Sequence, residues 1–251
     1  MININANIIG RQSGEGAPSS SLLNGLIHVW PLDEEGTTTS DLRMDSVGNA
    51  HLTPTATLMA QADGIHGKAY TNNGDNRALF TTSNEMKNIV LNSFTFTCWC
   101  KFNTVAADDG RILSIWLGTQ GPGEQRSFIF GKNVNGNINF TVSKNGLGGV
   151  ENVFSVVSPG IVTQGDWHFC AGWYDKDNGE IGVQLDEGIA TTSATEPIFV
   201  STYNFEIGRY NASGGLFNGQ VDEVYCWNRV LTEPERIELF NGGSGKFYPF
   251  G

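Results

Sequence analysis

The sequence is poor in charge and lacks long apolar runs, and each scarcity excludes a class of protein. Charged residues make up 16% of the 251 residues and hydrophobic residues 39%, so a disordered chain is excluded. No segment approaches the roughly 18 apolar residues of a membrane-spanning helix. The start of the chain lacks the basic flank and apolar core of a secretory signal. We expect a soluble, folded protein that does not insert into a membrane.

Basic residues are also few. The chain has 15 Lys and Arg against 26 Asp and Glu, which gives a net charge of −11. Phosphate backbones would be repelled by this charge on average, so we expect no nucleic-acid partner.

Cysteine is scarce as well, with four residues at Cys98, Cys100, Cys170 and Cys226. They are too few for a disulfide scaffold, and their spacing is not that of CxxC zinc pairs. Cys98 and Cys100 would point to the same face of one strand, with Cα atoms too far apart to bridge. All four fall in apolar runs, so we expect buried, free thiols.

What is abundant is glycine, at 32 positions, between short apolar runs. From Leu22 onward these runs alternate with Gly, Asn, Asp and Pro clusters, which indicates many antiparallel strands in one large domain. Residues 1–21 are rich in Asn, Gly and Ser and are expected to be an arm that docks on another surface. The expected sandwich spans residues 22–243, and residues 244–251 form a short aromatic tail.

Two strands are the clearest. Residues 94–102 alternate between an apolar and a mixed face, and residues 167–174 are apolar or small on both faces, which predicts a central strand covered on both sides. The Asp and Gly residues at 175–179 predict a hairpin turn after the second strand. The expected core includes Trp30, Phe96, Cys98, Cys100, Trp167, Cys170, Val224 and Cys226.

One short helix is predicted near the C-terminus. Thr232 can cap it, Pro234 suits its first turn, and Glu235 completes a capping box. Ile237 and Phe240 share a face, which we expect to close one end of the sandwich.

Several motifs, in order, carry a family resemblance. They are Leu23–Glu34 (LNGLIHVWPLDE), Asp45–Asn49, Gly64–Tyr70 (GIHGKAY), Phe94–Lys101, Trp167–Asp175 and Phe217–Arg229. Together they resemble the laminin-G-like, concanavalin A-like jelly-roll domains. The resemblance implies an all-β fold with two antiparallel sheets and one short C-terminal helix.

The same resemblance suggests two kinds of site. A structural calcium ion would lie near the joined chain ends, held by Glu34 or Asp45 with Asp222; the alternative is that these are ordinary turn residues. Sugar binding would need an exposed aromatic ring, and Trp116, Tyr203 and Tyr210 lie near loop-like segments. The alternative for each ring is packing in the core or at its rim.

Catalytic signatures are missing. Related hydrolases place carboxylates at alternate strand positions as E-x-D-x-x-E, whereas the pairs Asp186-Glu187 and Asp222-Glu223 are adjacent and would point to opposite faces. The four histidines are scattered, and no Ser or Cys stands in a nucleophile-elbow context. We therefore expect no catalytic residues and no enzyme activity.

The opening motif behind a short N-terminal segment resembles small virion proteins of tailed bacteriophages. This predicts a virion surface component, either a capsid decoration or a fibre or spike subunit, made in the host cytoplasm. Its partners would be other virion proteins or itself, as a homo-oligomer such as a trimer joined through residues 1–21, and a host-surface glycan. The alternatives are an exported bacterial carbohydrate-binding module, outside the cell or on its surface, and a degenerate glycoside hydrolase or lyase.

Overall fold

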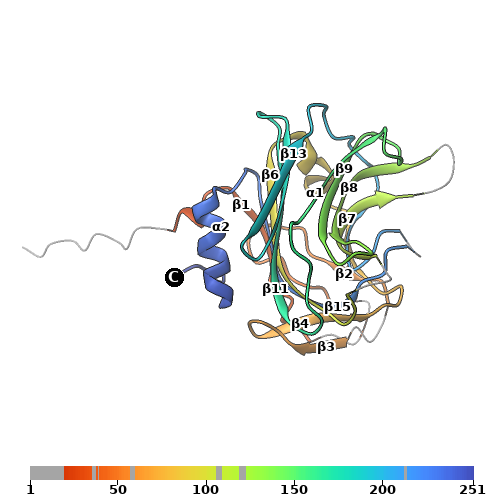
Figure 1. Cartoon of the computed structure of the whole chain (residues 1–251). Helices are drawn as coiled ribbons and strands as arrows, with labels where there is room; N and C mark the ends of the chain where they lie inside the picture. Colours follow the sequence, from red (N-terminus) through yellow and green to blue (C-terminus); the bar gives the residue numbers. More distant parts are fainter. Residues whose placement is uncertain are drawn as a thin grey trace, which may run out of the picture.

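The structure is a computed structural model that describes residues 20–35, 38, 40–56, 60–105, 109–118, 123–211 and 214–251. Two antiparallel sheets face each other (Figure 1), so the predicted all-β, two-sheet sandwich is confirmed. The eight-stranded sheet runs β13 (Gly188–Ser193), β12 (Glu180–Leu185), β11 (Trp167–Asp175), β6 (Phe94–Phe102), β15 (Asn218–Trp227), β4 (Lys68–Asn73) and β3 (Ala60–Asp63), and β1 (Leu26–Trp30) also pairs with β15. The seven-stranded sheet runs β10 (Val153–Val157), β9 (Ile138–Gly146), β8 (Gln125–Lys132), β7 (Gly110–Leu117), β14 (Phe205–Ile207), β5 (Leu79–Thr81) and β2 (Thr53–Pro54).

Helices are short. The predicted C-terminal helix is α2 (Glu233–Phe240), and its capping box between Thr232 and Glu235 is present. A second helix, α1 (Asn84–Asn88), was not expected, and the 3-10 turns are η1 (Ser21–Leu23), η2 (Ile89–Leu91) and η3 (Asn241–Gly243). Among the described residues, no helix has the length and apolarity to cross a membrane.

The main core lies between the sheets. On β6 the alternating residues Phe94, Phe96 and Phe102 are fully buried there with Cys98 and Cys100, as the period of two predicts. Of the expected core residues, Trp30, Phe96, Cys98, Cys100, Cys170, Val224 and Cys226 are fully buried, and the four cysteines are free thiols. Trp167 differs: it is partly exposed and packs on the outer face of the eight-stranded sheet.

A second apolar cluster covers that outer face. Phe169 and Ala171 of β11 meet Leu22, Leu239 of α2 and Phe250 of the tail. β11 is therefore covered on both sides, as its sequence predicted. The expected role of α2 was wrong: the helix lies across the outside of this sheet instead of closing an end (Figure 1). Leu239 is the buried apolar residue of α2, beside the buried Glu235 and Arg236, whereas Ile237 is 55% exposed.

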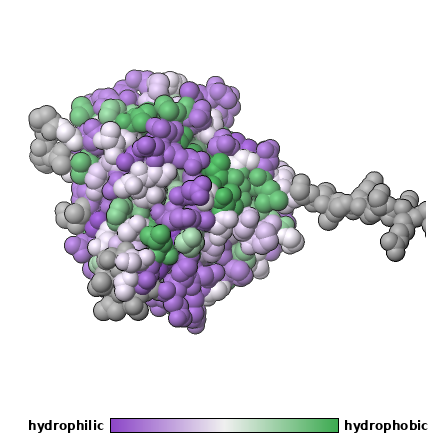
Figure 2. All heavy atoms as spheres, turned by 180° about the vertical axis from the view of Figure 1, so that it is seen from behind, coloured by the Kyte–Doolittle hydropathy of each residue, from purple (hydrophilic) through white to green (hydrophobic). Residues whose placement is uncertain are grey.

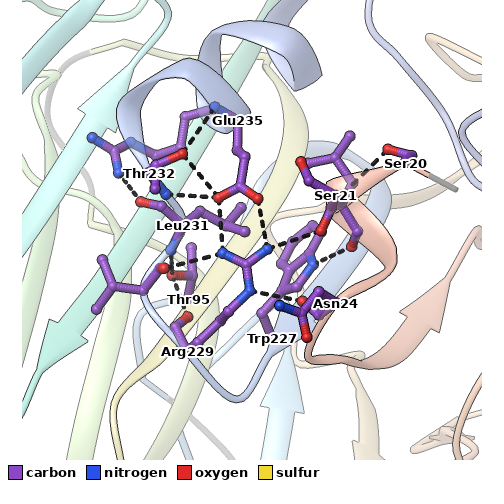
Figure 3. Close-up of polar contacts among 12 residues, drawn as sticks. Ser20, Ser21, Asn24, Thr95, Trp227, Arg229, Leu231, Thr232 and Glu235 are labelled. Carbon is purple, nitrogen blue, oxygen red and sulfur yellow. Dashed lines mark hydrogen bonds and ion pairs between the residues drawn. The ribbon is translucent and has the colours of Figure 1, made fainter. Parts of the chain in front are cut away.

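Arg229 joins the start of the described chain to α2 (Figure 3). Its guanidinium donates to the carbonyl oxygens of Ser21 at 3.1 Å and Asn24 at 2.7 Å, and pairs in a bidentate way with Glu235 at 2.7 and 2.8 Å. The hydrogen bond from Arg229 is the main reason that the pKa of Glu235 falls to about 2. The polypeptide at Ser21 is thus held on the α2 side of the sandwich.

The surface seen in Figure 2 is mainly polar, with apolar residues in separate patches. Such a surface is ordinary for a folded protein and does not by itself indicate a functional site.

Candidate functional sites

Asp45, a predicted metal ligand, is committed to the fold. Its carboxylate accepts hydrogen bonds from His28 Nδ1 at 2.6 Å and from the backbone N–H groups of Val29, Val47, Gly48 and Ala50 at 2.9–3.2 Å. Burial alone would raise its pKa, but the hydrogen bonds of His28, Val29 and Gly48 lower it to about 2. With its oxygens accepting these hydrogen bonds, Asp45 is a structural anchor of this turn.

The carboxylate of Glu34 has a different hydrogen-bonding environment from that of Asp45. One of its carboxylate oxygens accepts from Met44 N–H at 2.6 Å, and the other, Oε2, is buried without a hydrogen-bond partner. Within the described ranges no three His, Cys, Asp or Glu side chains converge closely enough to hold a metal. The expected set of Glu34 or Asp45 with Asp222 stays a prediction.

Asp222 does face a space that suits a cation, in the turn between β3 and β4. A methyl group built on Gly64 would touch Asp222 Oδ2 and lie 2.7 Å from the His66 carbonyl oxygen and 2.9 Å from that of Lys68. Three oxygens therefore surround one small space, which we call the oxygen cradle. Burial, and then the neighbouring Glu223, raise the pKa of Asp222 to about 8. The carboxylate of Asp222 also accepts the backbone N–H groups of His66 at 3.2 Å and Glu223 at 2.9 Å. Carboxylate and carbonyl oxygens are the donors that calcium prefers.

The carbonyl oxygens of the oxygen cradle could not be predicted from residue types, because every residue has a backbone carbonyl. The Gly64-Ile65-His66-Gly67 string could have indicated them, since its glycines leave room where a side chain would stand. Asp33 was also missed. It accepts from Lys68 N–H and contributes to the raised pKa of Asp222.

The predicted sugar-binding aromatics do not form one platform. Tyr203 packs against the main core. Trp116 is only 7% exposed, and the guanidinium carbon of Arg126 lies 5.2 Å from its ring centroid. Tyr210 is partly exposed, with Arg111 5.8 Å from its ring. Trp116 is thus not an open stacking surface, because an arginine already covers it.

The arginines instead mark a polar row along the outer face of β7. Phe205 and Ile207 of β14 point into the core, which turns Glu206 outward. Along β7, Arg111 comes first, Glu206 of β14 lies opposite Ser114, and Arg126 of β8 lies opposite Trp116. Arg111 donates to Asn139, and Glu206 accepts from Arg209 at 3.0 and 3.2 Å. We call Arg111, Glu206 and Arg126 the β7 row.

The β7 row has unmet hydrogen bonds. Seven side-chain atoms in the described residues are buried without a partner, and three of them are Arg111 Nε, Glu206 Oε2 and Arg126 Nε. Buried polar groups are nearly always satisfied. Two donors and one acceptor on one face therefore indicate a place for a ligand or water that offers both kinds of group. The sequence carries a signal for this row, since the charged Glu206 stands between Phe205 and Ile207 in one strand, but it was not recognised.

Arg126 is fixed from three sides. Its Nη2 pairs with Glu124 at 3.1 Å, its face lies on Trp116, and a methyl group built on Gly148 would overlap its Nη1. Gly148 N–H donates to the other oxygen of Glu124 at 3.1 Å. The guanidinium is therefore preorganised, and the absence of a side chain at 148 is what leaves room for it.

One arrangement has the connectivity of a catalytic triad. His168 Nδ1 lies 2.7 Å from Asp186, and its Nε2 lies 3.0 Å from Thr163 Oγ1. The same Nε2 accepts the backbone N–H of Thr163 at 2.9 Å, so its lone pair is occupied. The group ties the 163–168 turn to the β12–β13 hairpin and has no free base for proton transfer.

The two sheets define a jelly-roll β-sandwich. Residues 72–235, well over half of the chain, match the family model described as concanavalin A-like lectin/glucanases superfamily. The chain belongs to this superfamily. A comparison with curated protein sequences finds no match.

Solved structures show the same fold. Domain 4 of AbnA, an extracellular GH43 arabinanase of Geobacillus stearothermophilus in complex with arabinotriose, is 19% identical with a TM-score of 0.61, covering 84% of this chain and 96% of that one. The CBM40 of the Ruminococcus gnavus IT-sialidase, bound to α2,3-sialyllactose, is 17% identical with a TM-score of 0.57, over 74% and 98%. The binding domain of Paraclostridial Mosquitocidal Protein 1 is 14% identical with a TM-score of 0.64, over 88% and 52%.

Proposed function

We propose that this chain is a non-enzymatic carbohydrate-binding module whose ligand lies along the β7 row. The observation that carries the proposal is the group of three unpartnered buried atoms on Arg111, Glu206 and Arg126. A sugar hydroxyl donates and accepts, so one saccharide can satisfy arginine donors and a carboxylate acceptor together. The sugar-bound arabinanase domain and CBM40 support the proposal by their fold.

We also propose that the oxygen cradle binds a calcium ion. Asp222 and the carbonyls of His66 and Lys68 would hold the ion, which would neutralise buried acid and stiffen the turn between β3 and β4. The place of action that fits a carbohydrate-binding module is outside the cell or on a surface.

Replacing Gly148 with alanine tests the β7 row without removing any of its side chains. The new methyl group would occupy the position of Arg126 Nη1 and push the guanidinium off Trp116. On a glycan array that includes arabino-oligosaccharides and sialylated oligosaccharides, we expect wild-type binding to at least one glycan and a loss of about tenfold in affinity in the variant.

Gly160→Ala is the matched control, because a methyl group there meets only Leu185 at an ordinary 3.9 Å. Equal binding by Gly148→Ala and wild type would remove the β7 row as the site. An array on which the wild type binds no glycan would overturn the carbohydrate-binding proposal itself.

A more specific proposal is that the chain is a surface component of a bacteriophage virion. It is supported by the resemblance of the opening motif and by Arg229, which holds residues 21–24 on one side of the sandwich. Residues 1–19 of the expected arm lie outside the described residues. We expect a trimer or larger assembly by light scattering for the full chain and a monomer without residues 1–21. A monomer in both cases would leave the exported bacterial module as the better placement.

A further inference from the structure

A hollow of about 750 Å³ lies beside the C-terminal tail. It is far from the β7 row in the fold, because the tail packs on the outer face of the eight-stranded sheet whereas β7 belongs to the other sheet. Its lining comes from the β3–β4 turn, from α2 and from the tail, and includes His66, Glu238, Asn241, Lys246, Phe247 and Tyr248.

Aromatic rings form part of the wall. The rings of His66 and Phe247 stack with centroids 4.5 Å apart and planes 12° from parallel. Phe247 and Tyr248 are both partly exposed, and the side chain of His66 is 53% exposed. Exposed apolar ring surface beside polar groups is the usual composition of a small-molecule site.

A charged pair supplies hydrogen-bonding groups of both kinds. Lys246 Nζ lies 2.7 Å from Glu238 Oε1, and their side chains are 31% and 39% exposed. An ammonium that donates next to a carboxylate that accepts matches two adjacent hydroxyl groups, each of which can take either part. His66 Nδ1 is engaged by Glu223 at 2.9 Å, which leaves Nε2 for a ligand.

The hollow is held in place by the fold. The N–H groups of Gly245 and Lys246 donate to the carbonyls of Phe240 and Leu239 at 3.2 and 3.0 Å. Tyr248 N–H donates to the hydroxyl of Tyr225 at 3.1 Å. Phe250, only 4% exposed, packs with the rest of the second apolar cluster. Little of the binding energy would be spent on ordering the wall.

The charged groups around the tail hollow indicate which class of ligand it can take. The positive charge of Lys246 is balanced by Glu238, the buried carboxylate of Glu223 lies against His66, and the chain carries a net charge of −11. An anionic sugar would therefore be repelled. We infer that the tail hollow is a second saccharide-binding site, separate from the β7 row, and that it takes a neutral sugar with adjacent hydroxyl groups.

The test is a titration of the ¹⁵N-labelled full chain with arabinotriose, maltotriose and cellotriose at millimolar concentration. We expect at least one of them to shift amide resonances within residues 245–250, where Pro249 has no amide N–H, and that of His66. Glu238→Gln keeps the shape but loses the charge, and should weaken that binding about tenfold, the effect of one charge-assisted hydrogen bond. Glu233→Gln, the same exchange at the start of α2, is the control.

The experiments test the β7 row and the tail hollow independently. Gly148→Ala should leave the shifts at residues 245–250 unchanged, even though it displaces Arg126 from the β7 row. If the sugars shift only resonances near the β7 row, or if Glu238→Gln binds like Glu233→Gln, the tail hollow is not a saccharide site. If no sugar of the three shifts residues 245–250, the inference is overturned whatever the β7 row binds.

Discussion

Asp45→Ala is expected to lower the free energy of unfolding by about 3–5 kcal/mol, the cost of removing one partner from a buried, charged network. Asp45 is 5% exposed. Without it, His28 and the backbone N–H groups of Val29, Gly48 and Ala50 lose their acceptor. Urea unfolding measures the effect. Asp177→Ala, in an exposed turn, is the control, and a loss in Asp45→Ala no larger than in this control would contradict the assigned role.

The same residue gives a pH dependence with a definite sign. The folded pKa of Asp45 is about 2, below the value of about 3.9 for an unfolded aspartate. Its stabilising contribution is therefore present above about pH 4 and is lost as the pH falls toward 2. Stability measured over this range should decline more steeply in wild type than in Asp45→Ala. Parallel curves would mean that Asp45 is not held ionised by the fold.

Calcium is expected to raise the free energy of unfolding by about 2.7 kcal/mol when its free concentration is a hundred times its dissociation constant. The reason is that the oxygen cradle exists only in the folded chain. Gly64→Ala should abolish the increase, because its methyl group would fill the space between Asp222 and the carbonyls of His66 and Lys68. Thermal unfolding in calcium and in chelator is the measurement.

Asp222→Asn provides the second variant, since it removes a charged ligand atom and adds no bulk. Gly160→Ala, which meets no close atom, should respond to calcium as wild type does. An equal rise in the melting temperature for wild type, Gly64→Ala and Asp222→Asn would place any calcium elsewhere. No rise in wild type would remove calcium from the proposal and leave the saccharide sites standing.

The sequence predicted the fold better than the sites, for a physical reason. The strand period in residues 94–102 and the capping box at Thr232 and Glu235 are local patterns, and local patterns can be read along one segment. The strands β3 and β4 were not predicted because they carry mixed polar residues, and β2 was not predicted because it has only two residues.

The candidate sites depend on contacts between distant segments. The sequence places Trp116 near a loop, but in the fold Arg126 of β8 covers its ring, and Gly148 in the turn after β9 leaves room for that guanidinium. Asp45 and Asp222 are the same residue type, and both accept backbone N–H groups. Asp222 in addition lies beside Glu223, and its pKa is raised, whereas that of Asp45 is lowered. This difference comes from segments that are far apart in the sequence and not from the residue type.

The attachment of residues 21–24 by Arg229 would set the direction in which the sandwich faces if the chain were held through its N-terminal residues. Residues 21–24, α2 and the tail lie outside the eight-stranded sheet, whereas β7 belongs to the other sheet (Figure 1). A support gripping the chain through the residues before Ser21 would leave the β7 row facing away from it, free to meet a second surface. The tail hollow would face the support instead. Neighbouring molecules on the support would therefore block ligand access to the tail hollow before they blocked access to the β7 row.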